Sequence, residues 1–296
     1  MNQQAATSTE GKGPAVSIGM PVYNGEKSVS EAIDTLLAQT FTDFELIISD
    51  NASTDATESI CREYAARDLR ISYNRQRENR GAPANFQYVL EKARGKYFMW
   101  ASADDLRSPD FVEKNYRFLE ENPGFIASTS PVKYRGGGYD PRRMGDEPLT
   151  GDFEQRLLKF FSHLRHANGR FYSLIKLEAL KDCPYVAAGF LGFDWAVVLF
   201  LVSKGNFGRI DQGYVVIGRE GSSSSNNRYR TFRKRRLEWV LPAYELSRAT
   251  LSLTKGIRVR TKLRIWLFFA IQNAAMAGVN LACEGRRIFS AVRCLP

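Results

Sequence analysis

Two adjacent acids, Asp104 and Asp105, follow an apolar run, KYFMWAS (96–102), in the first half of the sequence. Neighbouring carboxylates repel each other, and burying them is costly without a cation or hydrogen-bond donors. A Mg²⁺ or Mn²⁺ ion that also holds a diphosphate would offset the repulsion, because such ions take few protein carboxylates and complete their shell with phosphate oxygens and water. The alternative is that the pair only makes a turn before the next helix.

Asp50 ends a second apolar run, FELIISD. A carboxylate there can accept a hydrogen bond from the imide N–H of a uracil or thymine ring, or from a ribose hydroxyl. The alternative is an Asx-turn that caps the following helix. Arg75, Arg77 and Arg80 come after a third run and can contact phosphate or stack on a base. Taken singly, surface arginines are more often only solvated.

A further acid, Asp194, lies near the start of a very apolar stretch, residues 189–205. A carboxylate in such surroundings tends toward a raised pKa, which suits a general base that works near neutral pH. The alternative reading is a first-turn acid that is favoured by the helix dipole. Both can hold at once.

The elements that must position these residues are four strand–helix units in the first 122 residues. Helical periodicity alternates with short β-rich runs, which predicts a mainly parallel sheet with helices on both faces. Ligands of such sheets lie in the crevice beyond the carboxyl ends of the strands, so the acids should converge there. Ser108 and Pro109 are expected to begin the fourth helix. The expected strands are 16–23, 44–50, 71–76 and 96–102, and the expected helices are 28–40, 54–67, 83–93 and 108–122.

The second half has a looser pattern. A strand at 125–134, a loop at 135–151, helices at 153–164 and 189–205, and one or two strands at 206–218 are expected, followed by helices in the last sixty residues. The polar segment 1–14 has no apolar signal-peptide core and is expected to be disordered.

Composition narrows the classes of partner. The chain has 296 residues and a formal net charge of +10, which favours anionic partners such as nucleotides, phospholipid surfaces, nucleic acid or acidic glycans. Its four cysteines form no C-x-x-C pair, which argues against a zinc cluster or a disulfide framework and suits a reducing compartment. With only two histidines, any metal is expected to be a hard ion held by oxygen ligands.

Three motifs occur in order: MPVYN (20–24), SDNASTDAT (49–57) and ENRGAPANFQYVLEKARGKYFMWASADD (78–105). Over residues 16–120 they closely resemble the nucleotide-sugar-binding half of the family 2 glycosyltransferases. The resemblance implies a GT-A fold, with a Rossmann-like, mainly parallel sheet flanked by helices, and Mn²⁺ or Mg²⁺ as cofactor. The domain boundaries that we expect are 15–225 for the GT-A domain (15–125 nucleotide-sugar binding, 126–225 acceptor binding) and 226–296 for a basic helical extension.

The resemblance also implies roles for single residues. Asp50 would read the base, Asp104 would serve the ribose side and Asp105 the metal, with Asp104 as a second ligand. Asp194 would be the catalytic base. The implied nucleotide-sugar-binding residues are Pro21, Tyr23, Asn24, Asp50, Asn79, Arg80, Gly81, Asn85, Asp104 and Arg219. The sequence departs from the family pattern at three positions. Many relatives have an acid at the position of Ser102, a Glu at the position of Phe193 and a His at the position of Glu220.

The C-terminal part carries much of the positive charge. Residues 265–282 are almost without charge, but Gln272, Asn273 and Asn280 interrupt them, so a membrane-spanning helix is at best marginal. We expect a helix that lies against the protein or in the membrane interface, and the alternative is a C-terminal core helix. No nucleic-acid recognition motif accompanies the charge. The basic residues expected to face anionic headgroups are Lys255, Arg258, Arg260, Lys262 and Arg264.

These observations favour an inverting glycosyltransferase that moves a sugar from a UDP- or dTDP-sugar to a hydroxyl acceptor. The acceptor is expected to be a glycan or lipid-linked glycan of the cell surface, met at the cytoplasmic face of the membrane. Two alternatives remain open. One is a sugar-phosphate nucleotidyltransferase, although the first strand lacks a glycine-rich, lysine-bearing phosphate loop. The other is a catalytically silent module that binds nucleotide sugars.

Overall fold

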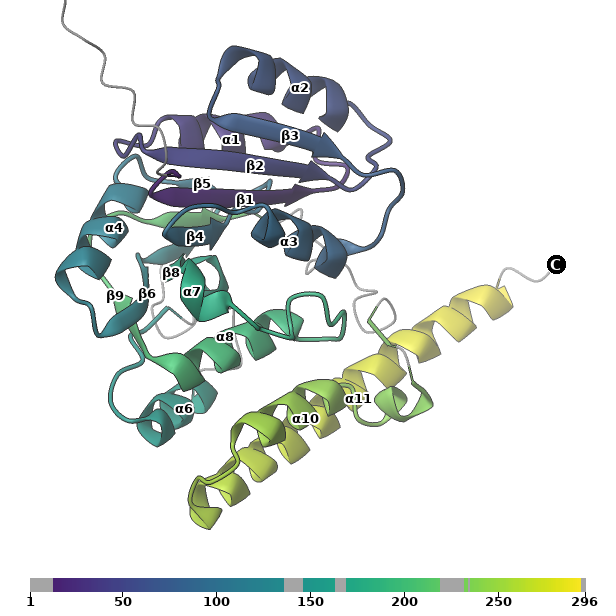
Figure 1. Ribbon diagram of the computed structural model, residues 1–296. Helices are drawn as coiled ribbons and strands as arrows, with labels where there is room; N and C mark the ends of the chain where they lie inside the picture. The colour runs from purple at the N-terminus through teal and green to yellow at the C-terminus, as the bar shows by residue number, and fades with distance from the viewer. Residues whose placement is uncertain (1–12, 136–145, 163–168, 219–231, 234, 294–296) are drawn as a thin grey trace, which may run out of the picture.

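The computed structural model shows a mixed α/β protein with a long helical hairpin at its C-terminal end (Figure 1). Two sheets form the centre. The large sheet has seven strands in the order β3-β2-β1-β4-β8-β6-β9, and the small one has three in the order β5-β10-β7. The structure describes residues 13–135, 146–162, 169–218, 232–233 and 235–293.

Four parallel strands make the first half of the large sheet, as the sequence predicted. They are β1 (Val16–Val22), β2 (Phe44–Asp50), β3 (Ile71–Arg75) and β4 (Tyr97–Trp100). The other half is mixed: β8 (Leu174–Lys176) is antiparallel to both of its neighbours, whereas β9 (Asn206–Arg209) is parallel to β6 (Phe125–Thr129). The small sheet consists of β5 (Leu106–Arg107), β7 (Val132–Tyr134) and β10 (Val215–Ile217).

Side chains alternate across the large sheet because successive residues of a strand point to opposite faces. Along β4, Tyr97 and Met99 join the core under α1 and α4, whereas Phe98 and Trp100 join the core under α3 and α8. The helices of this part of the chain are α1 (Val29–Leu37), α2 (Thr57–Arg67), α3 (Ala82–Glu91), α4 (Phe111–Glu121), α6 (Phe153–Ser162), α7 (Leu177–Leu180) and α8 (Phe193–Lys204).

Helix α3 lies unusually close to the sheet. A Cβ atom at Gly19 would come within 2.7 Å of the Val89 side chain, so only glycine allows β1 to meet α3 at this distance. This close approach brings the residues before and along α3 to the carboxyl ends of β1 and β2.

Two expectations were wrong in detail. Helix α4 begins at Phe111, after Asp110, because Leu106 and Arg107 pair with β10 and Ser108 bonds to Tyr214 instead of capping the helix. The expected single strand at 125–134 is two strands, β6 and β7, which belong to different sheets. The short helices η1 (Gly169–Tyr172) and η3 (Arg236–Trp239) were not expected.

The C-terminal region is helical, as expected. Helices α10 (Tyr244–Leu253) and α11 (Val259–Arg293) lie side by side and rest on α8 and α6 (Figure 1). Within the described residues, no helix combines the length and the apolar character that crossing a membrane would require.

Candidate active site

The carboxyl ends of β1, β2 and β3 form one edge of the sheet. The strand register sets Val22 opposite Asp50, and Asp50 opposite Arg75. A parallel arrangement therefore gathers the expected residues of three strand ends in one row, as predicted.

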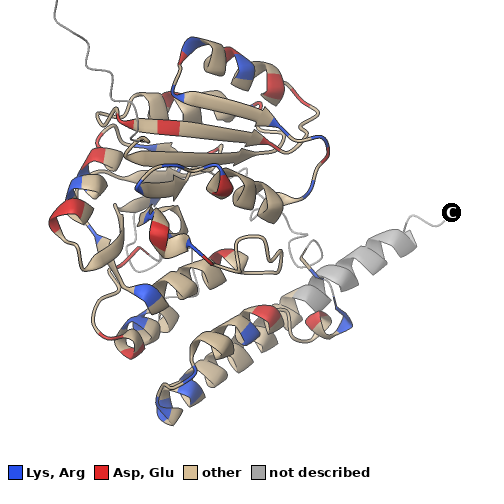
Figure 2. Cartoon of the chain, in the orientation of Figure 1, with Lys and Arg blue, Asp and Glu red and all other residues tan. Residues whose placement is uncertain are grey.

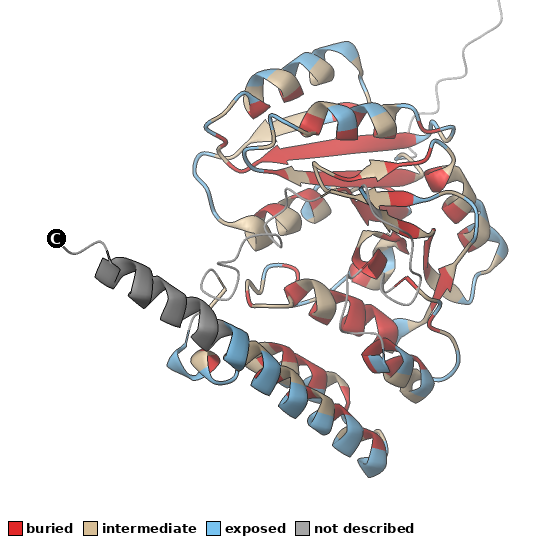
Figure 3. Ribbon diagram, turned by 180° about the vertical axis from the view of Figure 1, so that it is seen from behind, coloured by how far each residue is buried: buried red, intermediate tan, exposed pale blue. Residues whose placement is uncertain are grey.

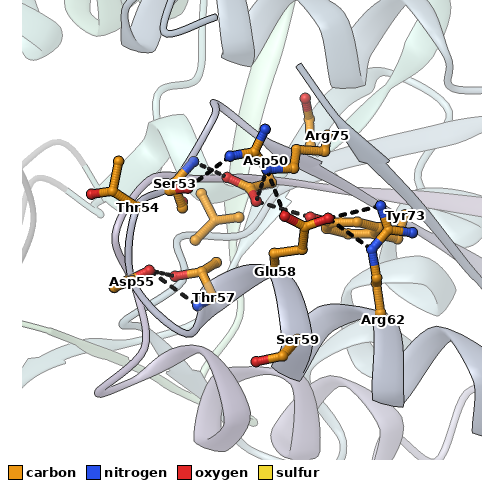
Figure 4. A network of polar contacts seen from close by, with 12 residues as sticks. Asp50, Ser53, Thr54, Asp55, Thr57, Glu58, Ser59, Arg62, Tyr73 and Arg75 are labelled. Carbon is orange, nitrogen blue, oxygen red and sulfur yellow. Dashed lines mark hydrogen bonds and ion pairs between the residues drawn. The ribbon is translucent and has the colours of Figure 1, made fainter. Parts of the chain in front are cut away.

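Asp50 is the centre of a polar network at this edge (Figure 4). Its side chain is fully buried, and its Oδ1 accepts a hydrogen bond from the backbone N–H of Ser53 at 2.8 Å. Its Oδ2 accepts one from the Tyr73 hydroxyl at 2.8 Å and lies 3.8 Å from Nε of Arg75. Both oxygens are thus engaged by the protein, and the network fixes the loop that follows β2.

Tyr73 and Arg75 complete this network. Burial and the bond to Asp50 raise the pKa of the Tyr73 hydroxyl, so it stays a donor. Arg75 pairs with Glu58 of α2 at 2.8 Å and donates to the Ser53 carbonyl at 2.9 Å. The arginine is therefore tied to α2 and to the loop.

Next to Asp50, the Asn51 side chain holds the segment before α3. Its Nδ2 donates to Oδ1 of Asn79 at 2.8 Å, and its Oδ1 accepts from the backbone N–H of Arg80 at 3.0 Å. Gly81 donates its own N–H to Asn79 and has φ = 82°, a conformation that costs glycine little. The Arg80 side chain is exposed. The sequence motifs selected Asn79, Arg80 and Gly81 for the site but not Asn51.

Asn85 points into the protein. Its Oδ1 accepts from the Ser49 hydroxyl at 2.6 Å, and its Nδ2 donates to the carbonyls of Ser49 at 2.8 Å and Val22 at 3.3 Å. The amide joins α3 to the ends of β1 and β2. In the described structure, Asn85 therefore positions this edge of the sheet.

The loop after β1 lies over the same edge. Asn24 donates its backbone N–H to the Ser53 hydroxyl and accepts from the Thr54 N–H, each at 2.9 Å, and Tyr23 is 48% exposed. Pro21, at the end of β1, is opposite Ser49 in the sheet register. This loop also approaches the acidic pair, because a Cβ at Gly25 would lie 3.7 Å from Cβ of Ala103.

Asp104 and Asp105 follow β4 and have different surroundings. Asp104 is partly exposed, and its Oδ1 accepts from the Ser102 hydroxyl at 2.5 Å. Asp105 is only 2% exposed, and its Oδ1 accepts from the backbone N–H of Gly218 at 2.9 Å. Its Oδ2 is buried without a hydrogen-bond partner among the described residues. Burial raises the pKa of Asp105 to about 6, against the opposing effects of Arg107 and the Gly218 N–H.

Gly218 brings the end of β10 against the acidic pair. A Cβ atom there would overlap the carboxylate and the carbonyl oxygen of Asp104. Behind the pair, the buried guanidinium of Arg107 donates to the Trp100 carbonyl at 3.0 Å, and burial lowers its pKa. Neither residue was predicted to be part of the site. The contact depends on β5 pairing with β10, which are more than a hundred residues apart.

Asp194 lies in the first turn of α8. The Phe193 ring beside it packs on Phe171 with ring centroids 6.0 Å apart, and Phe171 stacks on Trp100 of β4 at 4.5 Å and an interplanar angle of 4°. The start of α8 is therefore tied to the strand that leads to the acidic pair.

Tyr172, at the end of η1, interacts electrostatically with both groups of acids. Burial raises its pKa well above the ordinary value, and Asp105, Asp194 and Asp104 all add to that rise. The structure thus brings Asp194 into the electrostatic neighbourhood of the acidic pair, through a tyrosine that the sequence gave no reason to select.

Arg219, Glu220 and the serine-rich loop lie outside the described residues. No cluster of three or more His, Cys, Asp or Glu side chains suited to a metal occurs in the part of the chain that the structure describes. A pocket of about 670 Å³ opens at the other end of β4, where Lys96, Tyr97 and Glu120 line it, and none of the predicted site residues does.

Comparison with known proteins agrees with this geometry. Residues 17–183 match the family described as Glycosyl transferase family 2, which is more than half of the chain. The chain belongs to this family. The resemblance seen in its motifs is thereby confirmed.

Curated relatives match between about a third and 71% of the chain. The uncharacterized glycosyltransferase RT0329 of Rickettsia typhi is 39% identical over 108 residues, which are 36% of this chain and 33% of that protein. The minor teichoic acid biosynthesis protein GgaB of Bacillus subtilis is 29% identical over 216 residues, 71% of this chain and 23% of GgaB. The chain spans no more than 40% of the length of these and six further curated relatives that it matches.

Solved structures share the fold. TarS 1–349 of S. aureus, in complex with UDP-GlcNAc, has a TM-score of 0.58 at 20% identity, over 80% of this chain and 71% of that one. The mannosyltransferase PcManGT of Pyrobaculum calidifontis, in complex with GDP-Man and Mn²⁺, has a TM-score of 0.60 at 18% identity, over 96% and 76%. The predicted GT-A fold class is thereby confirmed.

Proposed function

We propose that this chain is an inverting glycosyltransferase that moves a sugar from a nucleotide diphosphate donor to a hydroxyl acceptor. The observation that carries the proposal is the arrangement of Asp105, whose Oδ2 is buried without a hydrogen-bond partner among the described residues, next to Asp104 and with Asp194 in the same electrostatic neighbourhood around Tyr172. One group, Asp104 and Asp105, would hold the donor diphosphate, and the other, Asp194, would take the proton of the acceptor hydroxyl. The reaction needs both groups at one site.

The nucleotide would lie over the sheet edge between the loop after β1 and the segment Asn79–Gly81. Tyr23 and Arg80 are the exposed side chains there that can stack on a base or ribose. Asp50 would serve base recognition from beneath, by fixing the loop after β2, and Asn85 by holding the strand ends. TarS, with UDP-GlcNAc bound, favours a UDP-sugar donor, and a dTDP-sugar fits the same argument.

The residues present fit a divalent cation. Asp105 offers a carboxylate oxygen without a hydrogen-bond partner among the described residues, and Asp104 offers a second carboxylate. Hard cations such as Mn²⁺ and Mg²⁺ take few protein oxygens when a diphosphate completes the shell. When bound, the ion would neutralise charge on the leaving diphosphate. The Mn²⁺ present with PcManGT is consistent with this assignment.

The chain's own residues would carry out a single displacement. Asp194 takes the proton from the acceptor hydroxyl, whose oxygen attacks the anomeric carbon as the bond to the diphosphate breaks. The attack comes from the face opposite the diphosphate, so the configuration inverts. Asp105 and Asp104 hold the donor end, and Arg219 is a further candidate for contact with phosphate.

The acceptor would be a glycan or a lipid-linked glycan of the cell surface. The net charge of +10 suits an anionic acceptor, and GgaB is named for teichoic acid biosynthesis. We place the reaction in the cytoplasm, at the inner face of the membrane, and assign nucleic acid no part in it.

The test is a panel of UDP-, dTDP- and GDP-sugars with and without Mn²⁺, in which release of nucleoside diphosphate is followed. We expect Asp194→Asn to lower transfer by roughly 10²- to 10⁴-fold while Mn²⁺-dependent nucleotide binding stays intact. Asp211→Asn is the matched control, because that side chain is 89% exposed. Pyrophosphate release from a nucleoside triphosphate, or loss of nucleotide binding in Asp194→Asn, would contradict the proposal.

A further inference from the structure

Helix α11 has two faces of different character, and the inner one is bound to the protein. Ile265, Phe269 and Asn273 are buried. The Asn273 Oδ1 accepts from the Ala243 N–H at 2.8 Å, and the Phe269 ring packs on Phe161 of α6 with centroids 5.6 Å apart. The inner face of α11 therefore packs on the protein, which is one of the placements that the sequence allowed.

The outer face is apolar yet exposed. Its large side chains fall on one side of the helix, since they follow helical spacing, and each is at least half exposed. Figure 3 shows this side of α11 as mostly exposed residues. Contiguous exposed apolar surface of this kind is typical of sites that bind another protein or a membrane. We call these five residues the α11 stripe: Val259 (71% exposed), Leu263 (61%), Trp266 (65%), Leu267 (54%) and Ile271 (50%).

Positive charge accompanies the stripe. The sequence from 246 to 283 has no Asp or Glu, and its six basic residues gather toward the end of the hairpin where α10 meets α11 (Figure 2). Arg258 pairs with Glu154 at 2.8 Å. The other basic residues around the start of α11 form no ion pair with any described residue: Lys255, Arg260, Lys262 and Arg264.

We propose that the α11 stripe docks into the interface of an anionic lipid bilayer, with the helix parallel to the membrane plane. Over the described side chains of α11, residues 259–279, the outer face is exposed and the inner face packs on the protein, so lipid can cover the outer face while the inner one keeps its contacts. Leucine and tryptophan side chains suit the boundary between headgroups and acyl chains, and the unpaired Arg and Lys side chains beside them suit anionic headgroups. The inference goes beyond the proposed function, since it depends on neither donor nor metal.

The experiment is co-sedimentation of the full chain with vesicles. One set contains phosphatidylcholine alone, and the other contains phosphatidylcholine with phosphatidylglycerol. We expect binding to the anionic vesicles that weakens roughly fivefold for each charge removed in Arg260→Gln and Arg264→Gln. Leu263→Ser and Trp266→Ser should each weaken it by roughly tenfold, because each loses several buried carbon atoms.

Matched controls distinguish docking of the α11 stripe from nonspecific binding to the vesicles. Leu69→Ser removes a fully exposed leucine from the turn before β3, far along the chain from the stripe, and should bind as the unaltered chain does. Trp emission should shift to the blue when anionic vesicles are added, and Trp266→Phe should abolish that shift while binding persists. The thermal unfolding midpoint verifies the fold of each variant, and Val259→Ser tests the same face a second time.

Three outcomes would overturn the proposal. The first is no binding to the anionic vesicles. The second is stripe variants that bind as tightly as the Leu69→Ser control. The third is a dimer in sedimentation velocity that the stripe variants disperse, because a second copy of the chain would then cover the stripe.

Discussion

Asp105 buries a carboxylate whose second oxygen lacks a hydrogen-bond partner among the described residues. Because burial raises its pKa to about 6, the folded protein keeps this proton at pH values where the unfolded chain, with a pKa near 3.8, has already lost it. The free energy of unfolding must therefore fall as pH rises from about 4 to about 6. The carboxylate that we propose as a cation ligand thus lowers the free energy of unfolding when it is ionised without the cation.

We predict that Asp105→Asn stabilises the metal-free protein. The neutral amide has no charge to desolvate, so the gain should approach about 3 kcal/mol above pH 6 and vanish near pH 4. Urea unfolding across this pH range measures it. The same variant should lose Mn²⁺-dependent nucleotide binding. Asp211→Asn, at an exposed position, should change neither quantity, and an unchanged pH slope in Asp105→Asn would contradict the prediction.

At the level of residues, sequence predicted which side chains gather but not which way they point. Asp50 and Asn85 lie where the motifs placed them, at one edge of the sheet. Yet Asp50 bonds to the Ser53 N–H and the Tyr73 hydroxyl, and Asn85 bonds to the carbonyls of Ser49 and Val22, because the fold packs each side chain against these groups. Side-chain direction depends on these neighbours, and a linear pattern does not contain them.

At the level of elements, the end of β10 closes the acidic pair from the side. The Gly218 N–H is the one described hydrogen-bond donor to the Asp105 carboxylate, and its missing side chain leaves space for Asp104. A strand of three residues thus supports the acidic pair of the proposed donor site, although it comes from the part of the chain that we expected to bind the acceptor.

We predict that Gly218→Ala weakens Mn²⁺-dependent nucleotide binding by about tenfold or more and costs about 1–3 kcal/mol of stability. The added Cβ would overlap Asp104, so β10 must move away and its bond to Asp105 must lengthen. Isothermal titration with UDP and Mn²⁺ measures the first effect and urea unfolding the second. Gly124→Ala is the control, since a Cβ there meets no atom within 4 Å.

Element prediction succeeded where periodic patterns are long. The bounds of β2 agree with the expected ones, and those of β1 and β3 differ by one residue. It failed for β5, β8 and η1, which span two to four residues each and leave no periodic signal. These pieces form because partners distant in sequence pair with them, as Leu106 and Arg107 do with β10.

At the level of the whole molecule, the C-terminal hairpin either belongs to the same cooperative unit as the sheet or merely rests on it. Phe269 is 7% exposed and belongs to the same apolar core as Phe98 and Trp100. The core therefore runs continuously from the sheet through α6 and α8 into α11.

We predict that Phe269→Ala lowers the free energy of unfolding by about 3–5 kcal/mol in a single transition. Leu267→Ala, two residues away on the exposed stripe, should change it by no more than about 0.5 kcal/mol. Urea unfolding followed by both circular dichroism and tryptophan emission distinguishes the cases. Equal effects of the two variants, or separate transitions in Phe269→Ala, would show that the hairpin unfolds on its own.

Strand β8 has a consequence for the order in which the chain can fold. It lies between β4 and β6 and pairs with both, although it follows β6 by some fifty residues along the chain. During synthesis, this edge of β4 therefore stays unpaired until the chain has been made beyond Lys176, and β5 stays unpaired until β10 has been made. An unpaired edge beside an apolar core is a site where nascent chains can join one another. The pairing of β10 with β5, which brings Gly218 to Asp105, thus also ends part of this exposure.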